Sequence, residues 1–213
     1  MRALCLAAGR ELGQSMVVEN KAGAAGMIGL KALASAKPDG YTVGQIPISV
    51  TRFSQLGTVA IDPMKDLTYL ARTSGQTFGI AVRADAPWKT LKEIVAHAKA
   101  NPGKVTYGSS GLGGATHVGM EEFAAVAGVQ FNHIPYKGGA PALQDLLGGQ
   151  LDSLADSSSW AAHVKSGKLR LLATWGEKRT QDFPEVQTLR EQGFDVVVDA
   201  PNGIGAPKGV DAA

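Results

Sequence analysis

The amino-acid sequence predicts an α/β fold whose sheets are mixed and mainly parallel. Segments with the two-residue hydrophobic period of strands alternate along the chain with segments that have the period of amphipathic helices. The loops between them are short and rich in glycine, which accounts for 27 of the 213 residues. Short connections between alternating strands and helices are typical of sheets that are covered by helices.

The N-terminal part of the chain is expected to hold two helices and several strands. Leu4, Ala7 and Leu12 recur at helical spacing, so a first helix is predicted to end at Gly13. A second helix opens near Met27, after a loop of glycine and alanine, and ends at the turn sequence KPDG. Strands are expected over residues 16–18, 41–46, 67–72 and 78–83, with an irregular excursion over residues 47–66.

From residue 90 onward the alternation of strands and helices is more regular. Thr90 and Glu93 form a capping box, in which each side chain accepts a hydrogen bond from the other residue's backbone N–H, so a helix is expected to follow Thr90. Further helices are predicted over residues 116–127, 141–147, 160–165 and 188–192. Strands are predicted over residues 105–107, 129–134, 151–155, 169–174 and 196–198.

One loop, in the stretch KVTYGSSGLGGATH between Lys104 and His117, has the composition of an anion-binding site. It follows a predicted strand and opens a helix, so its backbone N–H groups lie at the positive end of a helix macrodipole. Ser109, Ser110 and Thr116 add hydroxyl donors. The glycines leave the backbone uncovered for a ligand, although they also suit a strand-to-helix turn that binds nothing.

Three more loops of small residues leave the carboxyl ends of predicted strands, at residues 20–26, 136–141 and 156–159. In open α/β sheets, ligands bind beyond these strand ends. If the strands share an orientation, these loops converge with residues 108–116 on one cleft. Asp156 is open to three interpretations: a cap for the next helix, a catalytic acid, or a partner for a hydroxyl or amine of a ligand.

Composition and charge exclude two classes of partner. The formal net charge is only +2 and no basic run is present, so nucleic acid is not an expected partner. No segment approaches the ~20 apolar residues of a membrane span, and the apolar patch at residues 3–8 is too short for a signal peptide. We therefore expect a protein that is not inserted in a membrane.

The common catalytic, metal and cofactor motifs are not found in the sequence. The four histidines lack the spacing of metal ligands, and the single cysteine, Cys5, allows no internal disulfide and no cysteine-based metal site. Residues 108–111 lack the GxSxG spacing of a serine hydrolase, and residues 111–116 read GxGxxT without the acidic partner of a dinucleotide site. This inventory favours binding without turnover, with no metal and no cofactor.

Several long motifs resemble one family over nearly the whole chain. VVENKAGAAGMIG, PDGYTV, NPGKVTYGSSGLGGATHVGMEEF, HIPYKGGAPALQDLLGGQLD and VKSGKLRLLAT are similar, in this order, to motifs of the substrate-binding receptors of tripartite tricarboxylate transporters, the Bug receptors. The resemblance implies a periplasmic-binding-protein-like fold in which two α/β lobes close over a small carboxylate. It also implies a periplasmic receptor that delivers a dicarboxylate, a tricarboxylate, an acidic amino acid or an aromatic acid to a membrane permease.

The resemblance further implies the two lobes and the ligand contacts. The first lobe would comprise residues 1–82 together with 200–213, and the second lobe residues 83–199, with crossings near Gly79–Arg83 and Pro201–Gly205. The family's leader peptide, first strand and final helix have no counterpart here, so we expect an incomplete first lobe in a chain truncated at both ends. The implied ligand contacts are Ala24, Ala25, Ser109, Ser110, Gly113, Thr116, His117, Lys137, Gly138, Gly139, Ala140 and Asp156.

Two alternatives to the receptor hypothesis stay open from the sequence. The first is an α/β enzyme that acts on a carboxylate, with Asp156 or His117 as its base. The second is a folded remnant that binds nothing and associates through an exposed sheet edge. One departure from the family also matters, because residues 199–203 read DAPNG where the family commonly has an aromatic contact.

Overall fold

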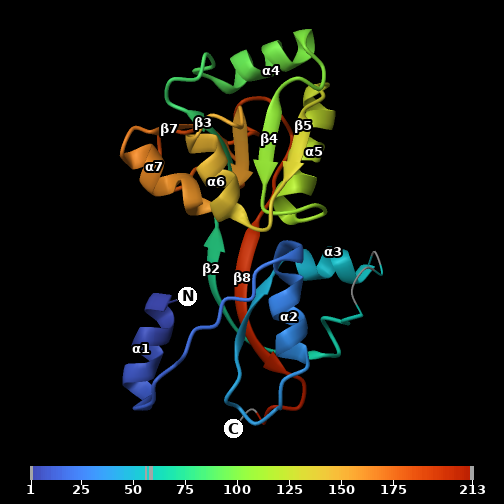
Figure 1. Ribbon diagram of the computed structural model, residues 1–213, viewed down its shortest axis with the longest axis vertical. Coiled ribbons are helices and arrows are strands. Elements are labelled where there is room, and N and C mark those ends of the chain that lie inside the picture. Colours follow the sequence, from blue (N-terminus) through green and yellow to red (C-terminus); the bar gives the residue numbers. More distant parts are fainter. Residues whose placement is uncertain (1, 56, 58–59, 212–213) are drawn as a thin grey trace.

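The computed structural model describes residues 2–55, 57 and 60–211, which form two sheets and their helices. Figure 1 shows a three-stranded sheet in the lower part of the molecule and a five-stranded sheet in the upper part. The upper sheet is accompanied by the helices α4 (Leu91–Ala100), α5 (Ala115–Ala127), α6 (Gly139–Leu147) and α7 (Ala161–Lys165). The prediction of an α/β fold with mixed sheets is therefore confirmed.

The lower sheet has the strand order β1-β8-β2, and both of its pairings are antiparallel. Its strands are β1 (Gly44–Pro47), β2 (Leu67–Gln76) and β8 (Ala200–Pro207). The helix α2 (Met27–Ala34) packs against this sheet, because Met27, Leu30 and Leu33 form one apolar stripe that joins Ile46 of β1 in a buried cluster. The lower sheet thus has its own apolar core.

The upper sheet has the strand order β5-β4-β6-β3-β7. Its strands are β3 (Gly79–Arg83), β4 (Thr106–Ser109), β5 (Asn132–Pro135), β6 (Ser153–Asp156) and β7 (Leu169–Thr174). Side chains of β3 alternate between its two faces: Ile80 and Val82 join the apolar cluster of α4 and α5, whereas Ala81 joins the cluster of α6. This sheet is therefore covered by helices on both faces.

The prediction that the sheets are mainly parallel is wrong. Four of the six pairings between the described strands are antiparallel, and only β4 runs parallel to its neighbours β5 and β6. In the upper sheet the cause is β3, which follows β2 directly and is antiparallel to both β6 and β7. The first residue of β3, Gly79, pairs with Asp156 and Thr174, so β3 enters this sheet at the edge where β6 and β7 end and runs opposite to both.

The chain crosses between the two sheets just before the predicted positions. It leaves the lower sheet through Thr77 and Phe78, and it returns through Asp199. Residues 79–81 of β3 and residues 202–205 of β8 are paired on both sides, as parts of the central strands of the two sheets. A strand held on both sides cannot change its backbone direction without losing these hydrogen bonds.

The N-terminal elements follow the prediction only in part. The first helix is present as α1 (Arg2–Leu12), but the strand expected over residues 16–18 is not formed, and Val17 is 88% exposed. The predicted excursion over residues 47–66 contains a regular helix, α3 (Ser49–Gln55), which buries Val50. An apolar run forms a strand only where a neighbouring strand accepts its hydrogen bonds, and none of the described strands pairs with residues 16–18.

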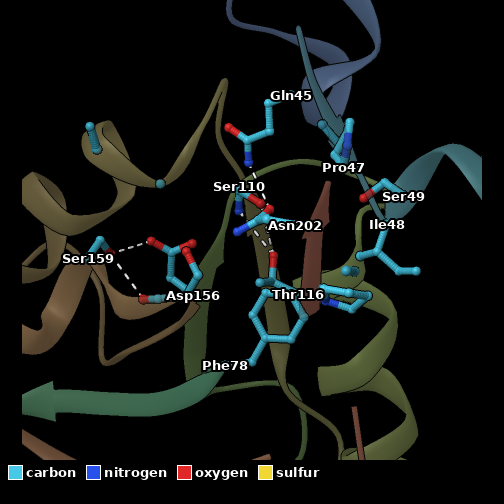
Figure 2. A pocket seen from close by; sticks show the side chains of 16 residues that line it. Gln45, Pro47, Ile48, Ser49, Phe78, Ser110, Thr116, Asp156, Ser159 and Asn202 are labelled. Carbon is cyan, nitrogen blue, oxygen red and sulfur yellow. Dashed lines mark hydrogen bonds between the residues drawn. The ribbon is translucent and has the colours of Figure 1, made fainter. Parts of the chain in front are cut away.

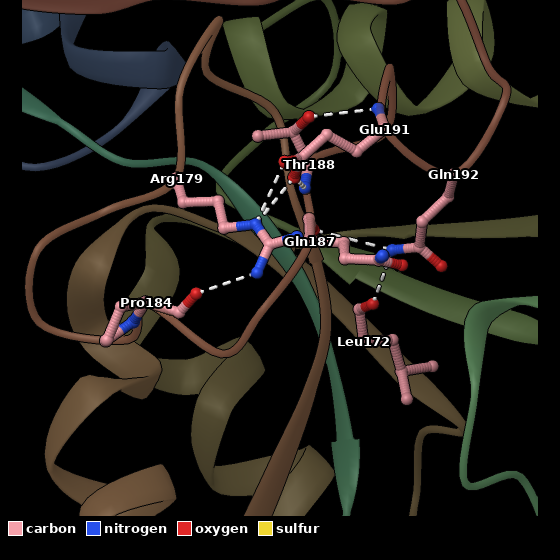
Figure 3. Close-up of polar contacts among 7 residues, drawn as sticks. All are labelled: Leu172, Arg179, Pro184, Gln187, Thr188, Glu191 and Gln192. Carbon is pink, nitrogen blue, oxygen red and sulfur yellow. Dashed lines mark hydrogen bonds and ion pairs between the residues drawn. The ribbon is translucent and has the colours of Figure 1, made fainter.

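The helix predicted over residues 188–192 is a hydrogen-bonded turn in the structure. Figure 3 shows that Thr188 Oγ1 accepts the backbone N–H of Glu191 at 3.1 Å, while the Glu191 carboxylate accepts the N–H of Thr188 at 2.8 Å. Arg179 Nε donates to the same carboxylate at 2.8 Å. Gly193 follows with a φ of 93°, so the turn ends before a helix can propagate.

The strand predicted over residues 196–198 is an irregular segment. Val196 and Val198 are buried, and the N–H of Val198 donates to the carbonyl of Trp175 at 2.8 Å. The run of three valines correctly indicated burial at this position, but not pairing with another strand.

Within the described part of the chain, no helix combines the length and the apolar character that crossing a membrane requires.

Candidate functional site

A cavity of about 330 Å³ lies where the four predicted loops meet. Figure 2 shows that its wall includes Ser110 and Thr116 on one side and Asp156 and Ser159 on another. The prediction that these loops share one cleft is confirmed, because each of them contributes to the lining. The contributions are Ala25 from the first loop, Ser110, Ala115 and Thr116 from the second, Gly139 and Ala140 from the third, and Asp156, Ser157 and Ser159 from the fourth.

The first loop reaches the cavity through an unusual backbone conformation. Ala24 and Ala25 have φ values of 46° and 51°, in the left-handed region that non-glycine residues rarely adopt. A Cβ atom added to Gly114 would lie 3.1 Å from the Cβ of Ala25, so glycine at this position lets the two loops approach. Backbone strain of this kind gathers at ligand sites because the surrounding structure must hold it in place.

The second loop presents hydrogen-bond donors at the beginning of α5. The hydroxyl oxygens of Ser110 and Thr116 lie 3.0 Å apart, and the N–H of Ser110 donates to Thr116 Oγ1 at 3.4 Å. Ala115 and Thr116 form the first turn of this 13-residue helix and line the cavity. An anion at this point would meet unpaired backbone N–H groups, a helix macrodipole and two hydroxyls.

Asp156 ends β6 and is the ionisable side chain of the cavity. It is 4% exposed, and Ser159 Oγ donates a hydrogen bond to its Oδ2. Burial raises the pKa of the Asp156 carboxyl, against the lowering effect of the hydrogen bonds from Ser159 and the Ser157 backbone. Asp156 does not cap the following 3-10 helix (Ser158–Trp160), whose N-cap is Ser157. The capping interpretation is therefore wrong.

Gly139 is adapted to the position of the Asp156 carboxyl. A Cβ atom added to Gly139 would lie only 2.2 Å from Oδ2 of Asp156. The first turn of α6 therefore contacts the carboxyl closely because residue 139 has no side chain. The carboxyl lies at the positive end of that helix.

The cavity is otherwise neutral. Of the residues that line it, only Asp156 carries an ionisable side chain, and no lysine or arginine is among them. In the described part of the chain, no group of three or more His, Cys, Asp and Glu residues is arranged to hold a metal ion. An organic anion in this cavity would be held by neutral donors and helix ends rather than by a counter-charge.

Sequence reasoning missed the wall that the lower sheet supplies. Gln45 of β1 and Asn202 of β8 line the cavity, and the Gln45 amide donates to Asn202 Oδ1 at 2.8 Å (Figure 2). The rule used on the sequence locates ligands at the carboxyl ends of parallel strands, and this sheet is antiparallel. The other missed residues of the lining are Pro47, Ile48, Ser49, Phe78, Ala115, Ser157, Ser159 and Pro201.

Six of the predicted contact residues lie outside the cavity lining. Ser109 is fully buried and its hydroxyl pairs with His133, and Lys137 is exposed on the surface. These residues lie next to the lining in the sequence, but their side chains have other surroundings. The six are Ala24, Ser109, Gly113, His117, Lys137 and Gly138. The part that any of the predicted residues plays in ligand binding stays a prediction.

Two α/β units, with a ligand-sized cavity at the loops between them, define the class of periplasmic binding proteins, and solved structures of this class share the fold. The sequence profile described as "Tripartite tricarboxylate transporter family receptor" matches residues 1–213. The chain belongs to this receptor family, as its motifs suggested.

Relatives and solved structures agree with this family. The chain is 50% identical over 210 residues to a Cupriavidus necator protein named "UPF0065 protein in gbd 5'region", covering 99% of this chain and 64% of that protein. It is 35% identical to protein BugT of Bordetella pertussis, covering 94% of this chain and 63% of BugT. It therefore spans less than two thirds of the length of these curated relatives.

Among solved structures, a periplasmic transporter superposes with a TM-score of 0.93 at 35% identity, covering 99% of this chain and 72% of that one. MatC of Rhodopseudomonas palustris, solved with bound malate, superposes with a TM-score of 0.88 at 27% identity, covering 99% of this chain and 73% of MatC. An R. palustris protein solved with adipate gives a TM-score of 0.89 at 26% identity, with 99% and 72% coverage.

Proposed function

We propose that this protein is a periplasmic solute-binding receptor that captures a small organic acid and passes it, chemically unchanged, to the permease of a tripartite tricarboxylate transporter. The observation that carries the proposal is the cavity of about 330 Å³, lined by neutral donors from four loops. Its one ionisable side chain, Asp156, has no second ionisable side chain beside it in the lining, and the adjacent hydroxyl of Ser159 has no histidine or lysine in the lining to activate it. Acid–base or nucleophilic catalysis needs such a partner, whereas binding does not.

The ligand carboxylate is placed at the second loop. Ser110 and Thr116 offer hydroxyls there, and the first turn of α5 offers backbone N–H groups. Ordered water can complete the set of hydrogen bonds. The two structural neighbours that are solved with malate and with adipate support a dicarboxylate or a similar acid as the ligand.

Two lobes are proposed to close over this ligand. The first comprises residues 1–82 with residues 200–213, and the second comprises residues 83–199. The cavity supports this division, because Gln45 and Asn202 belong to the lower sheet while Ser110 and Asp156 belong to the upper part. A ligand that contacts both walls stabilises the closed arrangement over the open one.

Isothermal titration calorimetry of the chain against a panel of acids tests the proposed function. The panel contains malate, succinate, adipate, aspartate, citrate and benzoate, with malamide as a neutral counterpart of malate. We expect saturable binding of at least one acid, no binding of malamide, and recovery of the bound acid unchanged after prolonged incubation. If none of the acids binds, the receptor function is contradicted. If a bound acid is chemically converted, the enzyme alternative is supported.

We propose that Asp156 contacts the end of the ligand that lies away from the second loop and determines which chemical group is accepted there. A buried carboxyl without a cation beside it in the lining favours a ligand group that donates a hydrogen bond, such as a hydroxyl or an ammonium. Malate should therefore bind more tightly than succinate, by about tenfold for one hydrogen bond to a charged group.

The Asp156→Asn variant tests this assignment. Because the amide is neutral and also donates, the variant should lose the preference for malate over succinate. An unchanged ratio of the two dissociation constants removes Asp156 from ligand selection, while binding itself still supports the receptor.

A further inference from the structure

A cluster of side chains behind the cavity wall anchors the loop that carries Ser110. The loop runs from Ser109 to Gly113, between β4 and α5. At one end, Ser109 Oγ lies 2.7 Å from Nε2 of His133. At the other end, the backbone N–H of Gly113 donates to Nδ1 of His117 at 3.1 Å. Each end of the loop is thus held by a histidine.

The two histidines form one stack. The ring centroids of His117 and His133 lie 4.1 Å apart with an interplanar angle of 22°, and the rings of Tyr107 and His133 stack at 4.7 Å. The Tyr107 hydroxyl donates to the carboxylate of Glu121 at 2.6 Å. In the described part of the chain, the titratable groups around this stack are therefore Tyr107 from β4, His133 from β5, and Glu121 from α5.

The contact with Gly113 determines the protonation state of His117. A backbone N–H can only donate, so Nδ1 of His117 must hold a lone pair and the ring proton must be on Nε2. A second ring proton would place an N–H group against the N–H of Gly113 and abolish this hydrogen bond. Ser109 differs, because its hydroxyl can accept from or donate to His133 in either protonation state.

The neighbouring ring is neutral near pH 7. Burial and the adjacent His117 lower the pKa of His133 to about 4, against the raising effect of Glu121. The contact between Ser109 and His133 is therefore unchanged in this range of pH. The sensitive contact of the loop is thus the one between Gly113 and His117.

We propose that His117 is a positioning residue for the loop at residues 109–113, and that a proton on its imidazole weakens carboxylate binding. The proposal rests on the proposed receptor function. A charged His117 releases the N–H of Gly113, so the loop that presents Ser110 loses one of its two anchors. By linkage, a bound acid disfavours the charged imidazole, so ligand binding releases protons. The affinity should therefore fall as the pH falls, because a protonated Nδ1 cannot accept the N–H of Gly113.

Calorimetry with malate tests the effect on binding. For the unmodified chain we expect a weaker affinity at about pH 6 than at about pH 8, by up to about fourfold for one imidazole, with proton release detected by comparing buffers of different ionisation enthalpy. His117→Asn places an amide oxygen near the position of Nδ1, which accepts from Gly113 but does not titrate. This variant should still bind malate at about pH 8, and its affinity should depend less on pH than that of the unmodified chain, with Asp156 contributing equally to both.

The control variant is His97→Asn. His97 is an exposed histidine of α4 that contacts Trp88, and α4 lies at the top of the molecule in Figure 1, away from the lower sheet. It should retain the full pH dependence and the proton release. Equal pH dependence in the unmodified chain and in His117→Asn overturns the proposal.

Nuclear magnetic resonance of the ligand-free, isotope-labelled chain tests the loop without reference to any ligand. The amide signals of Gly111 and Gly113 should shift with pH over the histidine range in the unmodified chain and stay constant in His117→Asn. If they are constant in both while malate binds, the proposal is wrong and the receptor function stands. If these signals shift but none of the panel acids binds at any pH, the receptor function is contradicted. The proposed effect of His117 protonation on carboxylate binding is then wrong as well.

Discussion

Gly139 and Asp156 are two residues whose identities depend on each other. The buried carboxyl of Asp156 lies so close to the backbone of α6 that any side chain at position 139 would meet it. Gly138, the preceding residue, has a φ of 123° and open space where a Cβ would be. The two glycines are therefore required for different reasons: contact at position 139 and backbone conformation at position 138.

Substituting alanine at position 138 or at position 139 tests the two requirements for glycine separately. Gly139→Ala should lower the free energy of unfolding by about 1–3 kcal/mol and weaken malate binding, because the new methyl group displaces the Asp156 carboxyl. Gly138→Ala should cost a similar free energy of unfolding through backbone strain and leave the carboxyl in place. Urea denaturation and calorimetry measure the two effects. Equal malate affinities in the two variants would contradict this account.

Ser110 is the hydroxyl of the second loop that faces the cavity. Ser110→Ala should weaken malate binding by about 1–2 kcal/mol, because one hydrogen bond to the carboxylate is lost. Ser158→Ala is the matched control, since Ser158 is exposed and is not among the residues that line the cavity. Calorimetry of both variants decides the question: if Ser110→Ala binds like the control, Ser110 does not contact the ligand.

At the scale of helices and strands, features that depend on residues close together in the sequence were predicted correctly, but the pairing of strands was not. The capping box at Thr90 and Glu93 is present as predicted, because it depends on residues three positions apart. The apolar runs at residues 16–18 and 196–198 were also predicted as strands, but none of the described strands pairs with them. Whether an extended segment becomes a strand depends on a neighbour distant in the sequence, which periodicity does not reveal.

The capping box gives the prediction for α4. Thr90→Ala should lower the free energy of unfolding by about 1 kcal/mol, because the N–H of Glu93 loses its side-chain acceptor. Urea denaturation measures the change. Lys92→Ala, at an exposed position of the same helix, is the control and should change stability by less than about 0.5 kcal/mol. Equal effects of the two substitutions would show that the capping box does not stabilise the helix.

At the scale of the whole molecule, the loops of the candidate site were predictable, but the wall that the lower sheet supplies was not. The loops that bring Ser110 and Asp156 to the cavity follow strand ends, where parallel α/β sheets place ligands. The wall with Gln45 and Asn202 was not predictable by the same rule, because it comes from the antiparallel sheet. No local pattern around Gln45 or Asn202 indicates that β1 and β8 direct these side-chain amides into the cavity.

His133 makes the stability of the molecule depend on pH. Its folded-state pKa of about 4 lies below the ordinary value of 6.5, chiefly because of burial. Between these values the unfolded chain binds more protons than the folded one, so the free energy of unfolding should decrease as the pH falls through this window.

Urea midpoints at about pH 7 and about pH 5 measure this effect. His133→Asn should be less stable at pH 7, because the ring contacts are lost, but its midpoint should depend less on pH. Asp156 titrates in both proteins, so its contribution cancels in the comparison. Identical pH dependence of the two midpoints would contradict the assigned role of His133.

A crystal structure of this chain grown with malate tests the central claim most directly. The account predicts one malate in the cavity between the loops, with a carboxylate at Ser110, Thr116 and the first turn of α5, and with its hydroxyl end toward Asp156. Malate bound instead in the apolar groove along Tyr69 and Leu70 of β2, with this cavity left to water, would contradict it.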